Sequence, residues 1–175
     1  MENDAVNEDL TIMNERMGNP KVLDSRIFLR PIKDLKPFMP ITIDIEDSLQ
    51  DALMFMQMKQ FGCVLVTKGS ELAGIVTERD IIAKVAPHGD FDSVKVKDIM
   101  TPNPEAFHEN DEIAYAVKAM SVGGYRHVPI VNESHEPVGM LSVKDVIRFI
   151  VDHFPDEIMN LPPSPIRKGT EREGA

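Results

Sequence analysis

The sequence has few of the features that cross-link a protein covalently or anchor it in a membrane. It has a single cysteine, Cys63, inside an apolar run, so disulfides do not hold the fold and a reducing cytoplasm is the expected location. No apolar run approaches the roughly 18 residues that a membrane-spanning helix needs, so no membrane partner is expected. The first 15 residues hold five acids and no Lys or Arg, which is unlike the start of a signal peptide.

The sequence also lacks the motifs of common enzymatic chemistry. It has no G-x-x-x-x-G-K-[ST], no G-x-G-x-x-G and no G-x-S-x-G. Its five histidines show no pairing at helical spacing that would suggest metal ligands. A lone thiol within a buried strand is inert. We therefore expect no enzyme, no metal site and no catalytic cofactor.

Positive charge is scarce as well. The formal net charge is -10, which argues against a nucleic-acid or anionic-membrane partner, because both require a basic surface. Hydrophobic residues make up 42% and charged residues 27% of the chain, a composition typical of globular proteins.

The sequence does contain an internal repeat. Residues 74–85 read GIVTERDIIAKV and residues 139–150 read GMLSVKDVIRFI, with the shared pattern G-h-h-[ST]-x-x-D, in which h is apolar. Matching positions lie 64 residues apart before Met120 and 65 apart after His127, so one residue is inserted between them in the second copy. The duplication spans residues 32–151.

Hydrophobic periodicity predicts the same order of elements in both halves. In the first half, residues 41–45 alternate as a short strand, Ser48 opens a helix, residues 63–66 and 72–76 form strands, and residues 77–85 form a second helix. The second half repeats this order, with its first strand near Ala106. The expected fold class is α/β, with two pseudo-symmetric β-α-β-β-α halves packed into one module.

Five segments follow from this pattern. We expect an acidic tail and leading segment at 1–31, a first domain at 32–87, a linker at 88–95, a second domain at 96–154 and a flexible, proline-rich C-terminal tail at 155–175.

These residues resemble the tandem CBS-domain pair, also called a Bateman module. The likeness rests on the two G-h-h-[ST]-x-x-D ends, the HVPIV strand at 127–131 and the KDIMTPNP segment at 97–104, and it covers about two thirds of the chain. It implies a non-catalytic regulatory sensor that binds an adenine nucleotide (AMP, ADP or ATP) in the clefts between the repeats. It also implies a homodimer packed as a flat disc, and an unidentified protein target. The helices expected at the dimer contact carry Met54, Met58, Val122 and Ile147.

The T-x-x-D and S-x-x-D ends have two interpretations. Each matches a helix capping box, a purely structural device. The same strand-to-helix geometry also offers free N–H groups and a helix dipole to an anion. The resemblance assigns Asp80 and Asp145 to ribose hydroxyls, with Thr77 and Ser142 near phosphate. Arg79 and Lys144 neutralise phosphate or belong to a solvated helix face.

Further site residues follow from the resemblance. Arg126 and His127 directly precede Val128 and Pro129 and are expected to point into the cleft of the second half, with Asp145. Because the matching first-half positions are Phe61 and Gly62, the second cleft is expected to be better equipped for phosphate. The slot for the base is placed beside the first strand of each half, at Ile41, Thr42, Glu105 and Ala106.

Two other function classes remain open at this point. In one, the chain is a structural or protein-interaction module whose clefts are empty and whose aspartates are only caps. In the other, it senses S-adenosylmethionine, a dinucleotide or a divalent metal.

Overall fold

A computed structural model describes residues 24–87, 89 and 91–154. Residues 1–23 of the acidic N-terminal segment and the C-terminal tail, which the sequence predicts to be flexible, lie outside the described residues.

The first half contains the predicted β-α-β-β-α order, preceded by two short 3₁₀-helices. Its elements are η1 (Ser25–Leu29), η2 (Ile32–Leu35), β1 (Thr42–Asp44), α2 (Leu49–Lys59), β2 (Cys63–Lys68), β3 (Glu71–Thr77) and α3 (Glu78–Lys84). The Ser48 hydroxyl caps α2 by accepting from the backbone N–H of Asp51 at 3.1 Å, as its sequence pattern predicts. The mixed sheet has the strand order β1-β2-β3-β4, and β4 comes from the second half.

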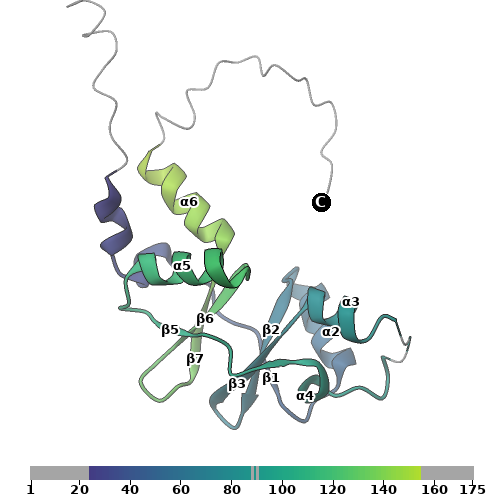
Figure 1. Cartoon of the computed structure of the whole chain (residues 1–175). Coiled ribbons are helices and arrows are strands. Elements are labelled where there is room, and N and C mark those ends of the chain that lie inside the picture. The colour runs from purple at the N-terminus through teal and green to yellow at the C-terminus, as the bar shows by residue number, and fades with distance from the viewer. Residues whose placement is uncertain (1–23, 88, 90, 155–175) are drawn as a thin grey trace, which may run out of the picture.

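The second half repeats the order around its own three-stranded sheet. Its elements are α4 (Val96–Ile99), β4 (Thr101–Pro102), β5 (Phe107–His108), α5 (Ile113–Gly123), β6 (His127–Val131), β7 (Pro137–Ser142) and α6 (Val143–His153). Figure 1 shows α5 and α6 above the sheet of this half, and α2 and α3 beside the sheet of the other half. The predicted α/β fold with two matching halves is confirmed.

Two short helices are exchanged between the halves. Ile32 and Leu35 of η2 are buried in the core of the second half, whereas Val96 and Ile99 of α4 are buried in the core of the first. Backbone bonds fix both positions, from the Ile32 N–H to the Asp111 carbonyl at 2.8 Å and from the Val96 N–H to the Asp47 carbonyl at 3.1 Å. Each half thus completes its core with a helix that precedes the other repeat.

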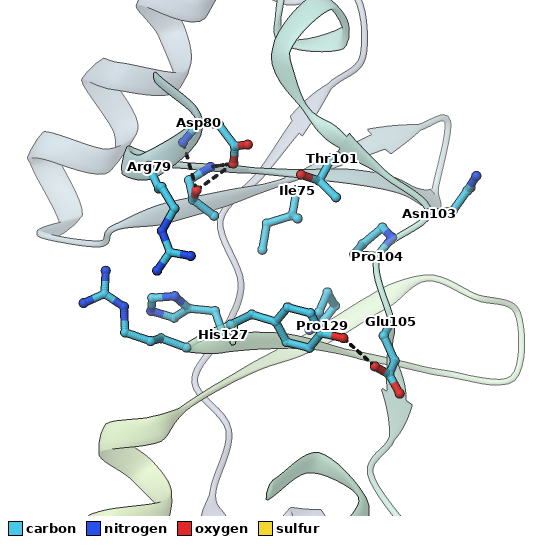
Figure 2. Close-up of a pocket in the computed structure, with 12 residues that line it drawn as sticks. Ile75, Arg79, Asp80, Thr101, Asn103, Pro104, Glu105, His127 and Pro129 are labelled. Atoms are coloured by element: carbon cyan, nitrogen blue, oxygen red, sulfur yellow. Dashed lines mark hydrogen bonds between the residues drawn. The ribbon is translucent and has the colours of Figure 1, made fainter. Parts of the chain in front are cut away.

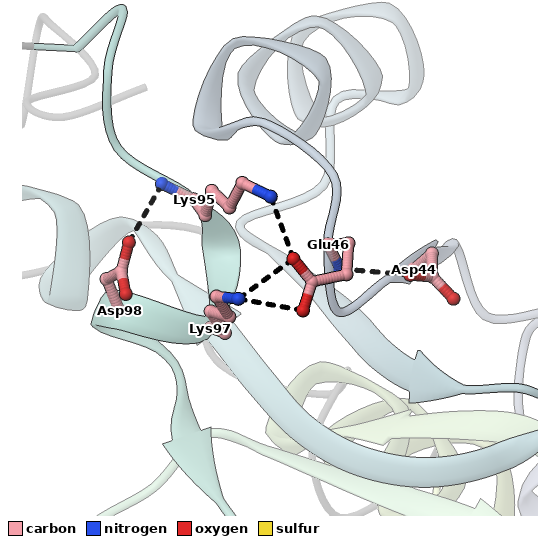
Figure 3. Close-up of polar contacts among 5 residues, drawn as sticks. All are labelled: Asp44, Glu46, Lys95, Lys97 and Asp98. Carbon is pink, nitrogen blue, oxygen red and sulfur yellow. Dashed lines mark hydrogen bonds and ion pairs between the residues drawn. The ribbon is translucent and has the colours of Figure 1, made fainter.

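Ion pairs fasten α4 to the first half on the outside. Glu46, in the turn after β1, accepts from Lys95 and Lys97, each at 2.7 Å (Figure 3). The hydrogen bonds from Lys95 and Lys97 lower the pKa of Glu46 to about 2. In the other half Lys33 donates to Asn110 at 3.0 Å at the corresponding place.

The two sheets meet through a separate apolar cluster, which consists of Cys63, Leu65, Leu72, Ile75, Val131 and Met140. Side chains alternate along a strand, so β3 turns Val76 into its own core and Ile75 toward the other half. Val128 of β6 likewise packs in the core of its own half. This alternation leaves the residues on either side, such as Pro129, facing the first half.

Within the described ranges, no helix is both long and apolar enough to cross a bilayer.

Candidate functional site

A cavity of about 480 Å³ lies between the two halves, where the end of β3 faces the start of β6. The first half contributes Ile75, Thr77, Arg79 and Asp80. The segment around β4 contributes Thr101, Asn103 and Pro104, and the rest of the second half contributes Glu105, Tyr125, Arg126, His127 and Pro129. Figure 2 shows Asp80 and Arg79 on one wall, with His127, Pro129 and Glu105 on the opposite wall.

One end of the cavity is cationic. Arg79 and Arg126 are exposed, and in the described part of the chain neither forms an ion pair. Figure 2 shows Arg79 and His127 reaching toward one another from opposite walls. Burial lowers the pKa of His127, and the positive charge of Arg126 lowers it further, so the imidazole is neutral near pH 7. This end therefore offers two uncompensated guanidinium groups and a neutral ring.

Asp80 closes the first wall and has one acceptor position left. Its Oδ2 accepts from the Thr77 backbone N–H at 3.0 Å and hydroxyl at 2.6 Å, and Thr77 Oγ1 in turn accepts from the Asp80 N–H at 3.2 Å. Oδ1 pairs with Lys84 at 2.8 Å. Burial raises the pKa of Asp80, but the bonds from Lys84 and Thr77 together outweigh burial, and the pKa lies below its usual value. Because a carboxylate has about four lone-pair sites, Oδ1 can accept one more hydrogen bond.

The other end of the cavity is apolar. Ile75, Pro104 and Pro129 line it together with the ring of Tyr125. The Tyr125 hydroxyl donates to Glu105 Oε2 at 2.7 Å, a bond that raises the pKa of the phenol. Thr101 and Asn103 add polar atoms at the edge.

Both T/S-x-x-D ends form the capping boxes that their patterns predict. Ser142 and Asp145 form the same reciprocal box as Thr77 and Asp80. In each aspartate the box uses Oδ2, and Oδ1 pairs with a cation, which for Asp145 is Arg148 at 3.2 Å. A cap therefore does not exclude a ligand at the remaining acceptor position.

Arg126 and His127, expected beside Asp145, adjoin both T/S-x-x-D ends. His127 pairs with Ser142 between β6 and β7, and the Arg126 carbonyl accepts from the Val143 N–H at 3.0 Å. Both residues also line the cavity that contains Asp80. The reason is that the halves pack across their sheets, so that the start of β6 faces the end of β3. The equivalent position in the other cleft belongs to Phe61, whose ring stacks on Phe38 with the centroids 4.6 Å apart. Phe38 in turn bridges to Met140 of β7.

The remaining site candidates lie elsewhere. Ile41 packs against the first core, Thr42 is exposed on β1, Ala106 packs at the sheet interface, and Val128 is in the second core. In the other cleft, Lys144 is exposed, whereas Ser142 and Asp145 are buried.

Sequence reasoning missed five residues that line the cavity, namely Ile75, Thr101, Asn103, Pro104 and Tyr125. Strand alternation could have found Ile75, because it lies two residues before Thr77. Tyr125 has no match in the first repeat, and an insertion gives no repeat signal.

Comparison with known proteins supports one family. The family model described as CBS domain matches residues 32–87 and 96–152. The chain is 33% identical over 122 residues to the CBS domain-containing protein CBSX3 of Arabidopsis thaliana, a match that covers 66% of this chain and 59% of that protein. It therefore spans less than two thirds of this relative, and a second curated relative, from Acidianus ambivalens, is covered over 53% of its length.

Solved structures share the fold. A CBS-domain-containing protein from Agrobacterium tumefaciens is 29% identical, with a TM-score of 0.61, over 68% of this chain and 98% of that chain. The CBS domain pair of protein MJ0100, solved in complex with 5-methylthioadenosine and S-adenosyl-L-methionine, is 26% identical, with a TM-score of 0.59, over 68% of this chain and 98% of that chain.

Proposed function

The chain belongs to the CBS-domain family, with two CBS domains, and from that membership we propose that it is a non-catalytic sensor of an adenine nucleotide. The ligand is of the AMP, ADP or ATP type and binds in the cavity that contains Arg79, Asp80, Arg126 and His127.

The observation that carries this proposal is a pair of arginines that form no ion pair within the described residues. Arg79 and Arg126 come from different halves and line the same cavity. A guanidinium group presents planar donors that match phosphate oxygens, and two of them without a carboxylate partner leave a local excess of positive charge in a chain of net charge -10. Such a site attracts a phosphate.

The rest of the cavity suits the remainder of a nucleotide. The free acceptor position of Asp80 can take a hydrogen bond from a ribose hydroxyl. Ile75, Pro104 and Pro129 offer an apolar slot for a base. The volume of about 480 Å³ falls in the range of roughly 300 to 1,000 Å³ that is usual for small-molecule sites.

A sulfonium ligand fits this cavity less well. Protein MJ0100 was solved with 5-methylthioadenosine and S-adenosyl-L-methionine. These molecules share the adenine and ribose ring with AMP, but one is uncharged, and the other carries a sulfonium and an ammonium against one carboxylate and is therefore a net cation, whereas AMP is an anion. The two arginines therefore favour a phosphate on the adenosine. Among the described residues, no group of three or more His, Cys, Asp or Glu is placed so that it could hold a metal ion.

Sensing follows from where the ligand binds. A nucleotide in this cavity contacts both halves, so its affinity differs between arrangements of the halves and it shifts their populations. A second copy of the chain and an unidentified protein target would respond to that shift. We place the homodimer contact on the helices that expose Met54, Met58, Val122 and Ile147, and the protein in the cytoplasm.

Calorimetric titration of AMP, ADP, ATP and S-adenosylmethionine tests the proposal. The wild type should bind at least one phosphate-bearing ligand more tightly than S-adenosylmethionine. Asp80→Asn should lose a charge-assisted hydrogen bond of roughly 1.5 to 3 kcal/mol, which is about 10- to 100-fold in affinity. Asp145→Asn is the matched control, because it alters the same kind of capping box at a residue that does not line the cavity. Binding of none of the three nucleotides by the wild type would refute the proposal, and an equal loss in both variants would move the site away from Asp80.

A further inference from the structure

A second, smaller cavity adjoins the first. Its volume is about 250 Å³, and it is lined by Phe107, Tyr115, Lys118, Ala119, Val122 and Gly123 together with Glu105 and Tyr125. Glu105 and Tyr125 also line the larger cavity. The hydrogen-bonded pair of Tyr125 and Glu105 therefore lines both cavities. The smaller cavity is mostly apolar.

Tyr125 is the extra residue of the second repeat. The helices α2 and α5 both end at a residue in the left-handed conformation, Gln60 with φ 56° and Gly124 with φ 69°. Gln60 and Gly124 therefore occupy the same position in the two repeats. The next residue of the first repeat, Phe61, corresponds to Arg126. Tyr125 therefore has no counterpart in the first repeat, and the wall that it forms exists in only one cleft.

The glycine before the cap makes room for the ring. A Cβ at Gly123 would overlap Cζ, Cε1 and the hydroxyl of Tyr125, so the ring lies directly over the Gly123 backbone. The matching residue in the first repeat is Lys59. From this position the hydroxyl donates to Glu105 Oε2 at 2.7 Å, so two residues that line both cavities are bonded to each other.

We infer that Tyr125, held by Glu105, is the specificity-determining residue that limits how far a bound base can extend at the apolar end of the site. This inference rests on the proposed adenine-nucleotide function. With the ring in place, the site accepts an unsubstituted adenine. Without the ring, the two cavities merge, and a base that carries an aromatic substituent fits with that substituent among Phe107, Tyr115 and Val122.

Two analogues with a benzyl group on opposite edges of the base, N6-benzyl-AMP and 8-benzylamino-AMP, test the inference without assuming how the base is turned. Their affinities, and that of AMP, are measured by calorimetry for the wild type, Tyr125→Ala and Tyr125→Phe. Tyr115→Ala is the matched control, because it makes the same change at a residue that lines only the smaller cavity. Gly123→Ala displaces the ring while the tyrosine is kept.

The wild type and Tyr115→Ala should bind AMP and discriminate against both analogues, and Tyr125→Phe, which keeps the ring but loses the bond to Glu105, should discriminate less than the wild type and more than Tyr125→Ala. Tyr125→Ala should bind at least one analogue tenfold or more tightly than the wild type does, and Gly123→Ala should change in the same direction. If the wild type binds AMP and all five proteins treat the analogues alike, the inference is wrong and the proposed function stands. If the wild type binds neither AMP nor the other adenine nucleotides, the proposed function fails and the inference fails with it.

Discussion

Arg126 and Phe61 occupy the same position in the two repeats, 65 residues apart, yet one lines an open cavity and the other stacks on Phe38. The duplicated clefts have therefore become different: one is cationic and hollow, and the other holds an aromatic pair. This asymmetry sets the first test.

Replacing Arg126 by Ala should weaken AMP binding by about 10- to 100-fold, because a charge-assisted bond to phosphate is worth roughly 1.5 to 3 kcal/mol. Arg148→Ala is the control, since Arg148 pairs with Asp145 in the other cleft. Calorimetry at two salt concentrations should show a weaker salt dependence for Arg126→Ala. An undiminished affinity would mean that phosphate does not lie between Arg79 and Arg126.

The lowered pKa of His127 predicts a pH dependence of stability. Burial and Arg126, with Lys144, lower this pKa below 6.5, and Asp145 and Glu78 only partly oppose them. The unfolded chain then binds the proton more readily than the folded protein, so the free energy of unfolding falls as pH drops through 6.5 toward the folded pKa.

His127→Asn should remove this dependence. Its free energy of unfolding, measured in urea at pH 7.5, 6.5 and 5.5, should decline less steeply than that of the wild type. The exposed His135, replaced by Asn, serves as the control and should follow the wild type. If the free energy of unfolding declines equally with falling pH in all three proteins, His127 is not the cause of the pH dependence.

The exchanged helices predict where a core mutation acts. Leu35→Ala should lower the free energy of unfolding by about 2 to 5 kcal/mol, because Leu35 is buried in a packed core. Leu29→Ala, the same change at a 59% exposed position, should cost less than about 0.5 kcal/mol. Native-state hydrogen exchange of the Leu35 variant should speed up more at β6 and β7 than at β2 and β3. The reverse order would mean that η2 supports its own repeat.

The exposed apolar helix residues predict self-association. Light scattering at micromolar concentration should give the mass of a dimer, because apolar faces of this kind usually mark an interface. Val122→Glu, at a side chain that is 80% exposed, should shift the mass toward the monomer. Val138→Glu is the control on β7, away from these helices. A monomer mass for the wild type across this range would exclude the dimer.

Most of the fold could be read from periodicity and repetition. Elements such as α2, with Ser48 as its cap, follow local rules that a sequence carries in full. The exchange of η2 and α4 could not be read, because a repeat shows which residues correspond and not which copy they pack against. The position of Arg126 in the cavity that contains Asp80 could not be read for the same reason.

The candidate site was predictable where it depends on local pattern. Thr77, Arg79 and Asp80 come from one motif, and Arg126 and His127 precede a strand that the pattern identifies. Tyr125 and Asn103 lie in irregular segments and Thr101 in the two-residue strand β4, and the course of all three depends on tertiary contacts rather than on spacing. Tyr125 in particular is an inserted residue, so comparison of the two repeats gives no corresponding residue from which a role could be predicted.

The exchange of η2 and α4 also bears on how this chain could be divided or rearranged. A fragment cut at the boundary between the sequence repeats would carry one surplus apolar helix and would lack Val96 and Ile99, or Ile32 and Leu35, from its core. The transplantable unit is therefore the complete pair. A single repeat grafted into another protein would retain its motif but would lack part of its core. It would fold only with a second copy, supplied in cis or in trans, that provides the missing short helix.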